Sequence, residues 1–183
     1  MVKLVGIAGS LRQGSYNRAL LRAAIELMPP GAELKALSID EVPLYNADNE
    51  HELGIPEPVV ALKRGIETAA GLVLVTPEYN GGMPGVLKNA IDWISRPPED
   101  IPRVLRGKAV ALMGATPGGF GTAFSQVGWL HVLRTLRMTV WVEQGPFYIS
   151  RAAESFGESG LEDAESRERL RKYLAAFVDH VGR

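Results

Sequence analysis

One stretch indicates the fold class most clearly: Gly71-Leu72-Val73-Leu74-Val75, followed by Thr76-Pro77-Glu78-Tyr79-Asn80-Gly81-Gly82-Met83-Pro84. Its apolar run shows no alternation with polar residues, which is typical of a strand buried on both faces. Pro84 is suited to a first helical position. The residues after it then repeat at the spacing of one helix face, as Leu87, Ala90, Ile91 and Ile94. The stretch therefore predicts a strand, a rigid loop and a helix.

The same alternation recurs along the chain. Strands are predicted at 4–8, 34–39, 72–75, 109–113 and 139–142. Helix faces are predicted from Leu20, Leu21, Ala24, Ile25 and Met28; from Val59, Leu62, Ile66 and Ala69; from Trp129, Val132, Leu133 and Leu136; and from Leu170, Leu174, Phe177 and Val181. The charged tract 151–169 is expected to be a solvated loop and a helix start. Alternating strands and helices favour an α/β fold, with a parallel sheet covered on both faces.

Length and composition narrow the function classes. The 183 residues predict a single domain, 1–183, without internal repeats. The chain has 20 Lys and Arg residues and 21 Asp and Glu residues, so it lacks the basic excess typical of nucleic-acid binders. The absence of Cys excludes disulfides, thiolate metal sites and Cys nucleophiles. No apolar run is long enough for a membrane span or a signal segment, and we expect a cytoplasmic protein.

Glycine is abundant, at 20 of 183 residues, and much of it follows predicted strands. Ligands of open parallel sheets bind beyond the carboxyl ends of the strands. After the first strand, Gly9-Ser10-Leu11-Arg12-Gln13-Gly14-Ser15-Tyr16-Asn17 offers hydroxyls, an Arg and a helix start, the donors that a phosphate needs. The alternative is that Ser15 or Asn17 only caps the helix.

The other two loops suggest walls for a flat ligand. In the loop at 76–84, Tyr79 is available for stacking, although Asn80-Gly81 is also the commonest kind of tight turn. The fourth strand is followed by Ala115-Thr116-Pro117-Gly118-Gly119-Phe120-Gly121-Thr122. Neither a G-x-x-x-x-G-K-[ST] motif nor a complete G-x-G-x-x-G motif is present, so nucleoside-triphosphatase and dinucleotide-binding Rossmann sites are not predicted.

Together these motifs resemble the NAD(P)H-dependent FMN reductase family, flavodoxin-like enzymes that include quinone, azo-dye and chromate reductases. The pattern G-S-x-R-x-x-S-x-N stands here as Gly9-Ser10, Arg12, Ser15 and Asn17. The second signature stands as Thr76 to Asn80 and Pro84-Gly85-Val86-Leu87-Lys88-Asn89-Ala90-Ile91-Asp92-Trp93. The resemblance implies a three-layer sandwich with five parallel strands in the order 2-1-3-4-5.

The resemblance also implies the roles of the loop residues. Ser10, Arg12, Ser15, Asn17 and the Tyr16 backbone would hold the FMN phosphate. The isoalloxazine ring would be bordered by Pro77, Glu78, Tyr79, Asn80 and Gly81, whose backbone donors would stabilise negative charge on the reduced ring. Thr116, Gly118 and Gly119 would flank the ribityl chain. No catalytic side chain and no metal ligand is implied. Two departures from the family are Gly81-Gly82 and the helix segment Gln126-Val127-Gly128-Trp129-Leu130.

By resemblance, NAD(P)H would give hydride to bound FMN and leave, and a quinone, free FMN, an azo dye or chromate would then take the electrons in a ping-pong cycle. A homodimer or homotetramer is also implied. A flavodoxin-like electron carrier without nicotinamide oxidation is the alternative, although such carriers are commonly acidic and this chain has a net charge of -1. A Ser hydrolase is disfavoured, because no G-x-S-x-G elbow accompanies His51, His131 or His180.

Overall fold

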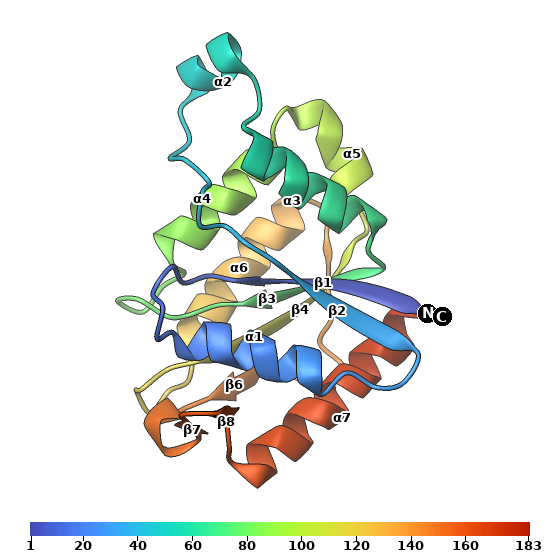
Figure 1. The fold of residues 1–183 in the computed structure, drawn as a ribbon. Helices are drawn as coiled ribbons and strands as arrows, with labels where there is room; N and C mark the ends of the chain where they lie inside the picture. Colours follow the sequence, from blue (N-terminus) through green and yellow to red (C-terminus); the bar gives the residue numbers. More distant parts are fainter.

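The computed structural model describes residues 1–183 and has a parallel sheet at its centre (Figure 1). The strands are β1 (Val2–Ala8), β2 (Ala32–Leu37), β3 (Gly71–Val75), β4 (Ala109–Ala115), β5 (Thr139–Val140) and β6 (Phe147–Ile149). Their order is β2-β1-β3-β4-β5, with β6 also beside β4, and every pair is parallel. The predicted α/β class and the strand order 2-1-3-4-5 are confirmed.

Seven α-helices surround the sheet: α1 (Tyr16–Glu26), α2 (Ala47–Leu53), α3 (Glu57–Thr68), α4 (Gly85–Ile94), α5 (Ile101–Val104), α6 (Ala123–Thr135) and α7 (Ala164–Val181). Helices α1 and α7 cover one face, and α3, α4 and α6 cover the other (Figure 1). Short 3-10 turns span Pro98–Asp100 and Ala152–Glu154, and a hairpin pairs β7 (Phe156–Gly157) with β8 (Gly160–Leu161).

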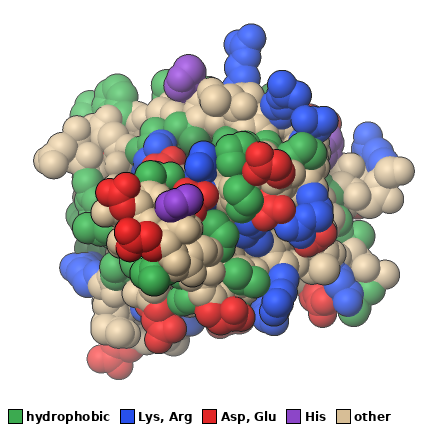
Figure 2. All heavy atoms as spheres, turned by 90° about the horizontal axis from the view of Figure 1, so that it is seen from above, with side chains coloured by type: hydrophobic (Ala, Val, Ile, Leu, Met, Phe, Trp, Pro, Cys, Tyr) green, Lys and Arg blue, Asp and Glu red, His purple; other side chains and the backbone are tan.

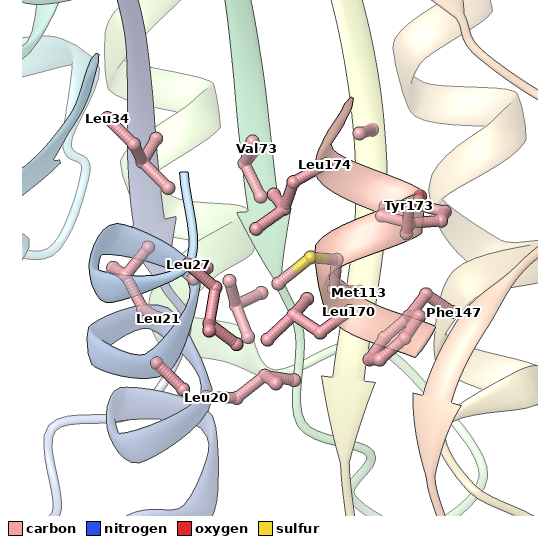
Figure 3. Close-up of a cluster of buried hydrophobic side chains, with 14 of the residues drawn as sticks. Leu20, Leu21, Leu27, Leu34, Val73, Met113, Phe147, Leu170, Tyr173 and Leu174 are labelled. Carbon is pink, nitrogen blue, oxygen red and sulfur yellow. The ribbon is translucent and has the colours of Figure 1, made fainter. Parts of the chain in front are cut away.

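The central strands are apolar on both faces because each face has its own core. In β3, Val73 and Val75 belong to the cluster under α1 and α7, whereas Leu72 and Leu74 belong to the cluster under α3, α4 and α6. Figure 3 shows the first cluster, with side chains such as Leu20 of α1 and Leu170 of α7 gathered against the strands. The continuous apolar runs are therefore a direct consequence of the three-layer arrangement.

The predicted fifth strand, 139–142, is wrong in its extent. Pairing of β5 with β4 ends at Val140, apart from one further bond in which the Trp141 N–H donates to the Val110 carbonyl at 2.8 Å. The chain then leaves the sheet edge and returns as β6, which pairs with the last residues of β4. Gly145 has φ +69° and Pro146 has no N–H, so neither suits a continuous strand. Sequence periodicity missed β6 because it has only three residues.

Other expectations need smaller corrections. Pro84 precedes α4 as its N-cap and is not its first helical residue. Ile25, expected on the buried face of α1, is 37% exposed. The tract 151–169 is not wholly solvated, because Ala152 and Leu161 are buried. The polar segment before α3 contains α2, which the apolar periodicity could not indicate since α2 has no buried residue.

The surface carries both signs of charge. The end of the molecule that carries α2 shows Lys and Arg side chains interspersed with Asp and Glu, without a continuous basic face (Figure 2). None of the helices is both long enough and apolar enough to span a membrane.

A partly buried ion pair makes the stability of the fold depend on pH in the acid range. The Lys63 ammonium, on a residue only 5% exposed, pairs with Asp100, which also accepts from Arg103 at 2.8 Å. These hydrogen bonds, the one from Lys63 first, hold the pKa of Asp100 below its ordinary value. A folded-state pKa below the unfolded value of about 3.9 stabilises the fold above that value, and the stabilisation is lost as the pH falls through the folded value.

We therefore expect the free energy of unfolding of the wild type to fall more steeply below about pH 5 than that of Asp100→Asn. The difference in slope corresponds to the uptake of at most one additional proton on unfolding. Urea unfolding at a series of pH values measures both slopes. Parallel curves for the two proteins would contradict the prediction.

Candidate functional site

Three loops meet at the carboxyl edge of the sheet, after the neighbouring strands β1, β3 and β4. The Gly9 N–H donates to the Val75 carbonyl at 2.9 Å, and the Thr76 N–H donates to the Met113 carbonyl at 2.8 Å, so the loops start in fixed register. They enclose a cleft of about 230 Å³. It is lined by Ser10, Arg12, Ser15, Tyr16, Asn17, Pro77, Glu78, Tyr79, Ala115, Thr116 and Pro117.

Most of the residues that the resemblance singles out line this cleft. Asn80, Gly81, Gly118 and Gly119 lie in the same loops but outside the lining. The three motifs, which are far apart in sequence, are thus brought to one place by the strand order.

The first loop presents hydrogen-bond donors at the start of α1. The Ser15 hydroxyl oxygen accepts from the N–H groups of Asn17 and Arg18, which makes Ser15 the helix N-cap, and the Ser10 oxygen accepts from the Arg12 N–H. Both hydroxyl hydrogens stay free to donate, because neither Ser oxygen donates within the protein. The backbone N–H groups of Leu11, Gln13 and Gly14 also have no protein acceptor.

Asn17 connects the first loop to the third. Its amide donates to the Ala115 carbonyl at 2.8 Å, and its amide oxygen accepts from the Ala115 N–H at 2.9 Å. Asn17 is 4% exposed, so the reciprocal pair is shielded from water. The side chain of Asn17 thereby fixes the start of α1 against the end of β4, and with it the spacing between two walls of the cleft.

The second loop is a tight hairpin. Tyr79 and Gly82 exchange backbone hydrogen bonds of 3.1 and 3.0 Å, and the two central residues, Asn80 and Gly81, have φ of 52° and 69°. Left-handed conformations at both positions are the signature of a type I′ turn, which explains the Asn-Gly pair. The N–H groups of Glu78, Asn80 and Gly81 have no protein acceptor and are available to a ligand edge.

Glu78 and Thr76 join the second loop to α6. The Glu78 carboxylate accepts from the N–H groups of Phe124 and Ser125 at 2.9 and 3.1 Å, where the positive end of the helix dipole favours a negative group. The buried Thr76 hydroxyl lies 2.7 Å from the Ser125 hydroxyl and accepts from the Trp129 indole at 3.0 Å. Sequence reasoning missed these α6 partners, because nothing in a linear motif indicates which helix a loop will contact.

The third loop is held by the end of β6 and the segment after it. The Thr116 N–H donates to the Ile149 carbonyl, and the carbonyls of Thr116 and Gly118 accept from Ala152 and Arg151, each at 3.0 Å. The ring of Phe156 in the β7–β8 hairpin lies 5.4 Å from that of Tyr16, so the same C-terminal region also contacts the first loop. The tract after 147 therefore supports the cleft, which the sequence did not indicate.

Charge near the first loop is partly neutralised. The Arg18 Nε donates to the Ser10 carbonyl at 2.9 Å, and its guanidinium pairs with Asp40, which lowers the pKa of that carboxyl. Arg12 has no carboxylate partner; its guanidinium donates to the Gly14 carbonyl at 2.7 Å and is exposed at the cleft. No cluster of three or more His, Asp or Glu side chains could hold a metal ion.

This donor set fits a flat phosphorylated cofactor such as FMN. The first loop combines two buried hydroxyls, unpaired backbone N–H groups, a guanidinium without a carboxylate partner and a helix N-terminus, which together suit a phosphate. The hairpin at 79–82 supplies further backbone donors beside an exposed tyrosine ring, Tyr79.

Comparisons with known proteins agree with this geometry. Residues 2–154 match the NADPH-dependent FMN reductase family. An NAD(P)H-dependent FMN reductase of Pseudomonas aeruginosa is 44% identical over 182 residues, covering 96% of this chain and 93% of the relative. A 2-hydroxy-1,4-benzoquinone reductase of a Burkholderia species is 38% identical, covering 97% of this chain and 93% of the relative.

A solved structure extends the similarity to three dimensions. It is that of a flavoenzyme NAD(P)H:(acceptor) oxidoreductase from Paracoccus denitrificans, with a TM-score of 0.87 and 31% identity, covering 100% of this chain and 98% of that one. Motifs, strand order, cleft and relatives point the same way. The chain belongs to the NADPH-dependent FMN reductase family.

Proposed function

We propose that this protein is an FMN-dependent NAD(P)H oxidoreductase that passes electrons to quinones and other flat acceptors. The observation that carries the proposal is the convergence of three donor-rich loops on one cleft at the carboxyl edge of the sheet. The names of the relatives, an NAD(P)H-dependent FMN reductase and a benzoquinone reductase, support the same chemistry.

In this proposal the chain binds and orients, and bound FMN supplies the hydride-accepting and electron-donating chemistry. Ser10, Arg12, Ser15 and the Tyr16 backbone would hold the phosphate, with Asn17 fixing the loop that carries them. The N–H groups of residues 78, 80 and 81 would be available to the isoalloxazine ring and would favour negative charge on it. Thr116, Gly118 and Gly119 would border the ribityl chain. No side chain acts as an acid or base, and NAD(P)H and the acceptor occupy the cleft in turn.

The first test is anaerobic mixing of the purified FMN-loaded protein with NADPH or NADH. We expect the yellow absorption band to bleach and to return when a quinone is added, with repeated turnover. A band that neither nucleotide bleaches would contradict the proposal. In that case the flavodoxin-like electron carrier remains, because a carrier binds FMN without oxidising nicotinamide.

Arg12→Ala is expected to weaken FMN binding about tenfold, since a charge-assisted hydrogen bond to an anion is lost at a solvent-exposed position. Fluorescence titration of the FMN-free protein with FMN measures the dissociation constant. Arg22→Ala is the matched control, because it removes the same charge from the exposed side of α1, outside the cleft lining. Equal effects of both substitutions would mean that only net charge matters and would remove Arg12 from the site.

Exposed aromatic rings beside the cleft favour flat acceptors. Phe120 and Phe124 are 77% and 57% exposed, and their ring centroids lie 6.4 Å apart. The Phe124 N–H donates to the carboxylate of Glu78, which lines the cleft. Exposed rings of this kind can stack on a quinone or an azo dye, whereas chromate offers no face for stacking. We therefore place quinones before chromate among the acceptors.

We further propose a homodimer or homotetramer in the cytoplasm. The segment that carries α2 stands out from the body of the molecule (Figure 1), and Leu44 and Leu53 on it are 82% and 81% exposed. Large apolar side chains on a projecting segment favour contact with another copy of the chain. Sedimentation equilibrium of the wild type and of Leu44→Ser/Leu53→Ser measures the contribution of this segment to assembly.

A further inference from the structure

Arg151 adopts a left-handed backbone conformation at the edge of the sheet that bears the cleft. It follows β6 and has φ 47° and ψ 47°. Residues other than glycine adopt this conformation at an energetic cost. Two other non-glycine residues have a positive φ, Asn80 in the hairpin of the cleft and Arg137 before β5. Such conformations persist where the surrounding structure imposes them, and they cluster at ligand sites.

Backbone hydrogen bonds impose the conformation of Arg151. Its N–H donates to the Gly118 carbonyl, and the next N–H, that of Ala152, donates to the Thr116 carbonyl, each at 3.0 Å. The Arg151 carbonyl accepts from the Glu154 N–H at 2.8 Å. The residue is therefore fixed against the third loop, of which Thr116 lines the cleft. Glycine would suit this bend better, so the backbone gives no reason for an arginine side chain here.

The guanidinium of Arg151 has no partner within the protein. Arg151 is exposed, and its side chain forms neither an ion pair nor a hydrogen bond, whereas Arg103 pairs with two carboxylates. A Cβ on Gly118 would approach only the Thr116 hydroxyl, at 3.8 Å, and a Cβ on Gly119 would meet no heavy atom within 4 Å. The two glycines therefore leave room for the long side chain of Arg151 to extend over the third loop.

The surroundings of the cleft thus contain two guanidiniums without carboxylate partners, Arg12 on the first loop and Arg151 beside the third. Glu78 is the one acidic side chain in the lining, and its carboxylate already accepts from two N–H groups of α6. Arg12 and the hydroxyls of the first loop suit the phosphate of FMN. A nicotinamide nucleotide brings a pyrophosphate as well and, in NADPH, a 2′-phosphate, for which a further cation is needed.

We propose that Arg151 binds a phosphate group of the reducing nucleotide, NADPH or NADH, when this nucleotide enters the cleft. A guanidinium donates paired hydrogen bonds to a phosphate, and its rigid shape limits the entropy that is lost for each bond. The inference rests on the proposed function, because it assigns a residue to the nucleotide of that reaction. No motif indicated Arg151, since it begins a charged tract without a distinguishing pattern.

Arg151→Gly separates this role from a structural one. Glycine relieves the left-handed conformation, so Tm should rise by about 2–4 °C while nucleotide binding weakens. Calorimetry of the oxidised, FMN-loaded protein with NADP⁺ and NAD⁺ measures affinity without turnover. We expect the variant to bind NADP⁺ about tenfold more weakly than the wild type does, the effect of one charge-assisted hydrogen bond. The KM for NADPH should rise by the same factor, with kcat unchanged.

The two nucleotides identify the phosphate group. A loss confined to NADP⁺ would assign Arg151 to the 2′-phosphate, and an equal loss for NAD⁺ would assign it to the pyrophosphate. Either result supports the proposal. Arg151→Lys keeps the charge and should recover part of the lost affinity, although a lysine lacks the paired donors of a guanidinium.

Arg137→Gly is the matched control. Arg137 is also an exposed arginine without an ion-pair partner, and its φ of 60° is left-handed too. It lies just before β5, at the opposite edge of the parallel sheet from the cleft. The substitution removes the same charge and relieves the same conformation. It should therefore raise Tm as Arg151→Gly does, and leave the affinity for both nucleotides unchanged.

Four results would overturn the proposal in a wild type that oxidises NADPH. The first is unchanged nucleotide affinity in Arg151→Gly. The second is an equal loss in Arg137→Gly, which would leave net charge as the cause. The third is a loss accompanied by a lower Tm, which would make Arg151 a structural residue. The fourth is weaker FMN binding with an unchanged KM at saturating FMN, which would assign Arg151 to the cofactor. A wild type that oxidises neither nucleotide would contradict the proposed function and this assignment with it.

Discussion

Asn17→Ala is expected to lower the free energy of unfolding by about 2–6 kcal/mol, because it leaves two buried groups of Ala115 without partners at once. The Ala115 N–H and carbonyl both bond to the Asn17 amide, and each unpaired buried group costs about 1–3 kcal/mol. The substitution should also weaken FMN binding, since the start of α1 is no longer fixed against β4. Urea unfolding followed by circular dichroism and FMN titration measure the two effects.

Asn46→Ala is the control for this prediction. Asn46 caps α2 by accepting one hydrogen bond from the Asp48 N–H at 2.8 Å, at an exposed position outside the cleft lining. Loss of such a cap costs about 1 kcal/mol and should leave FMN binding unchanged. If Asn17→Ala were as stable as Asn46→Ala and lost only FMN affinity, Asn17 would be a ligand of the phosphate and not a support of its loop.

Gly114→Ala is expected to destabilise the fold by about 3 kcal/mol, the upper end of the usual cost of overpacking. A Cβ on Gly114 would lie 2.0 Å from the Thr122 hydroxyl and 2.5 Å from the Thr76 carbonyl. The hydroxyl could rotate away, but the carbonyl belongs to the backbone of the loop that begins the motif at 76–80. Relieving the clash between the new Cβ and the Thr76 carbonyl would therefore displace β3 from β4 at the edge of the sheet that bears the cleft.

Gly119→Ala provides the comparison, because a Cβ there would meet no heavy atom within 4 Å. It should change the unfolding free energy by no more than about 0.5 kcal/mol. Thermal unfolding of both variants is sufficient, since about 3 kcal/mol corresponds to a decrease of roughly 6–12 °C in Tm for a chain of this length. A Tm of Gly114→Ala within 2 °C of that of Gly119→Ala, on the order of 1 kcal/mol or less, would show that the strand edge tolerates the extra carbon.

The fold could be predicted where burial imposes a period on the sequence. Leu72 to Val75 must be apolar at every position because helices cover both faces of the sheet, and this pattern can be recognised in the sequence alone. Elements that bury little leave no such pattern. Helix α2 has no buried residue, and β6 has three residues, so the first was expected as a polar loop and the second was not expected at all.

The sequence indicated which loops form the candidate site, but not which contacts hold these loops together. Ser10, Arg12, Tyr79 and Thr116 are predicted from motifs that follow strands, and the structure places them around one cleft. Contacts between residues far apart in the sequence could not be predicted. The motif contains Glu78, but only the fold shows that its carboxylate binds the start of α6.

By itself, the sequence determined the layer order, the strand-end loops and the kind of ligand they suit, because these depend on local composition and on the regular spacing of apolar residues. Only the tertiary structure decided how the loops are held together, through Asn17 to Ala115 and Glu78 to α6, and where the fifth strand opens beside Trp141. The physical reason is range. Periodicity and turn chemistry act within a few residues, whereas these contacts join residues 46–98 positions apart, and which partners meet is set by strand order and packing.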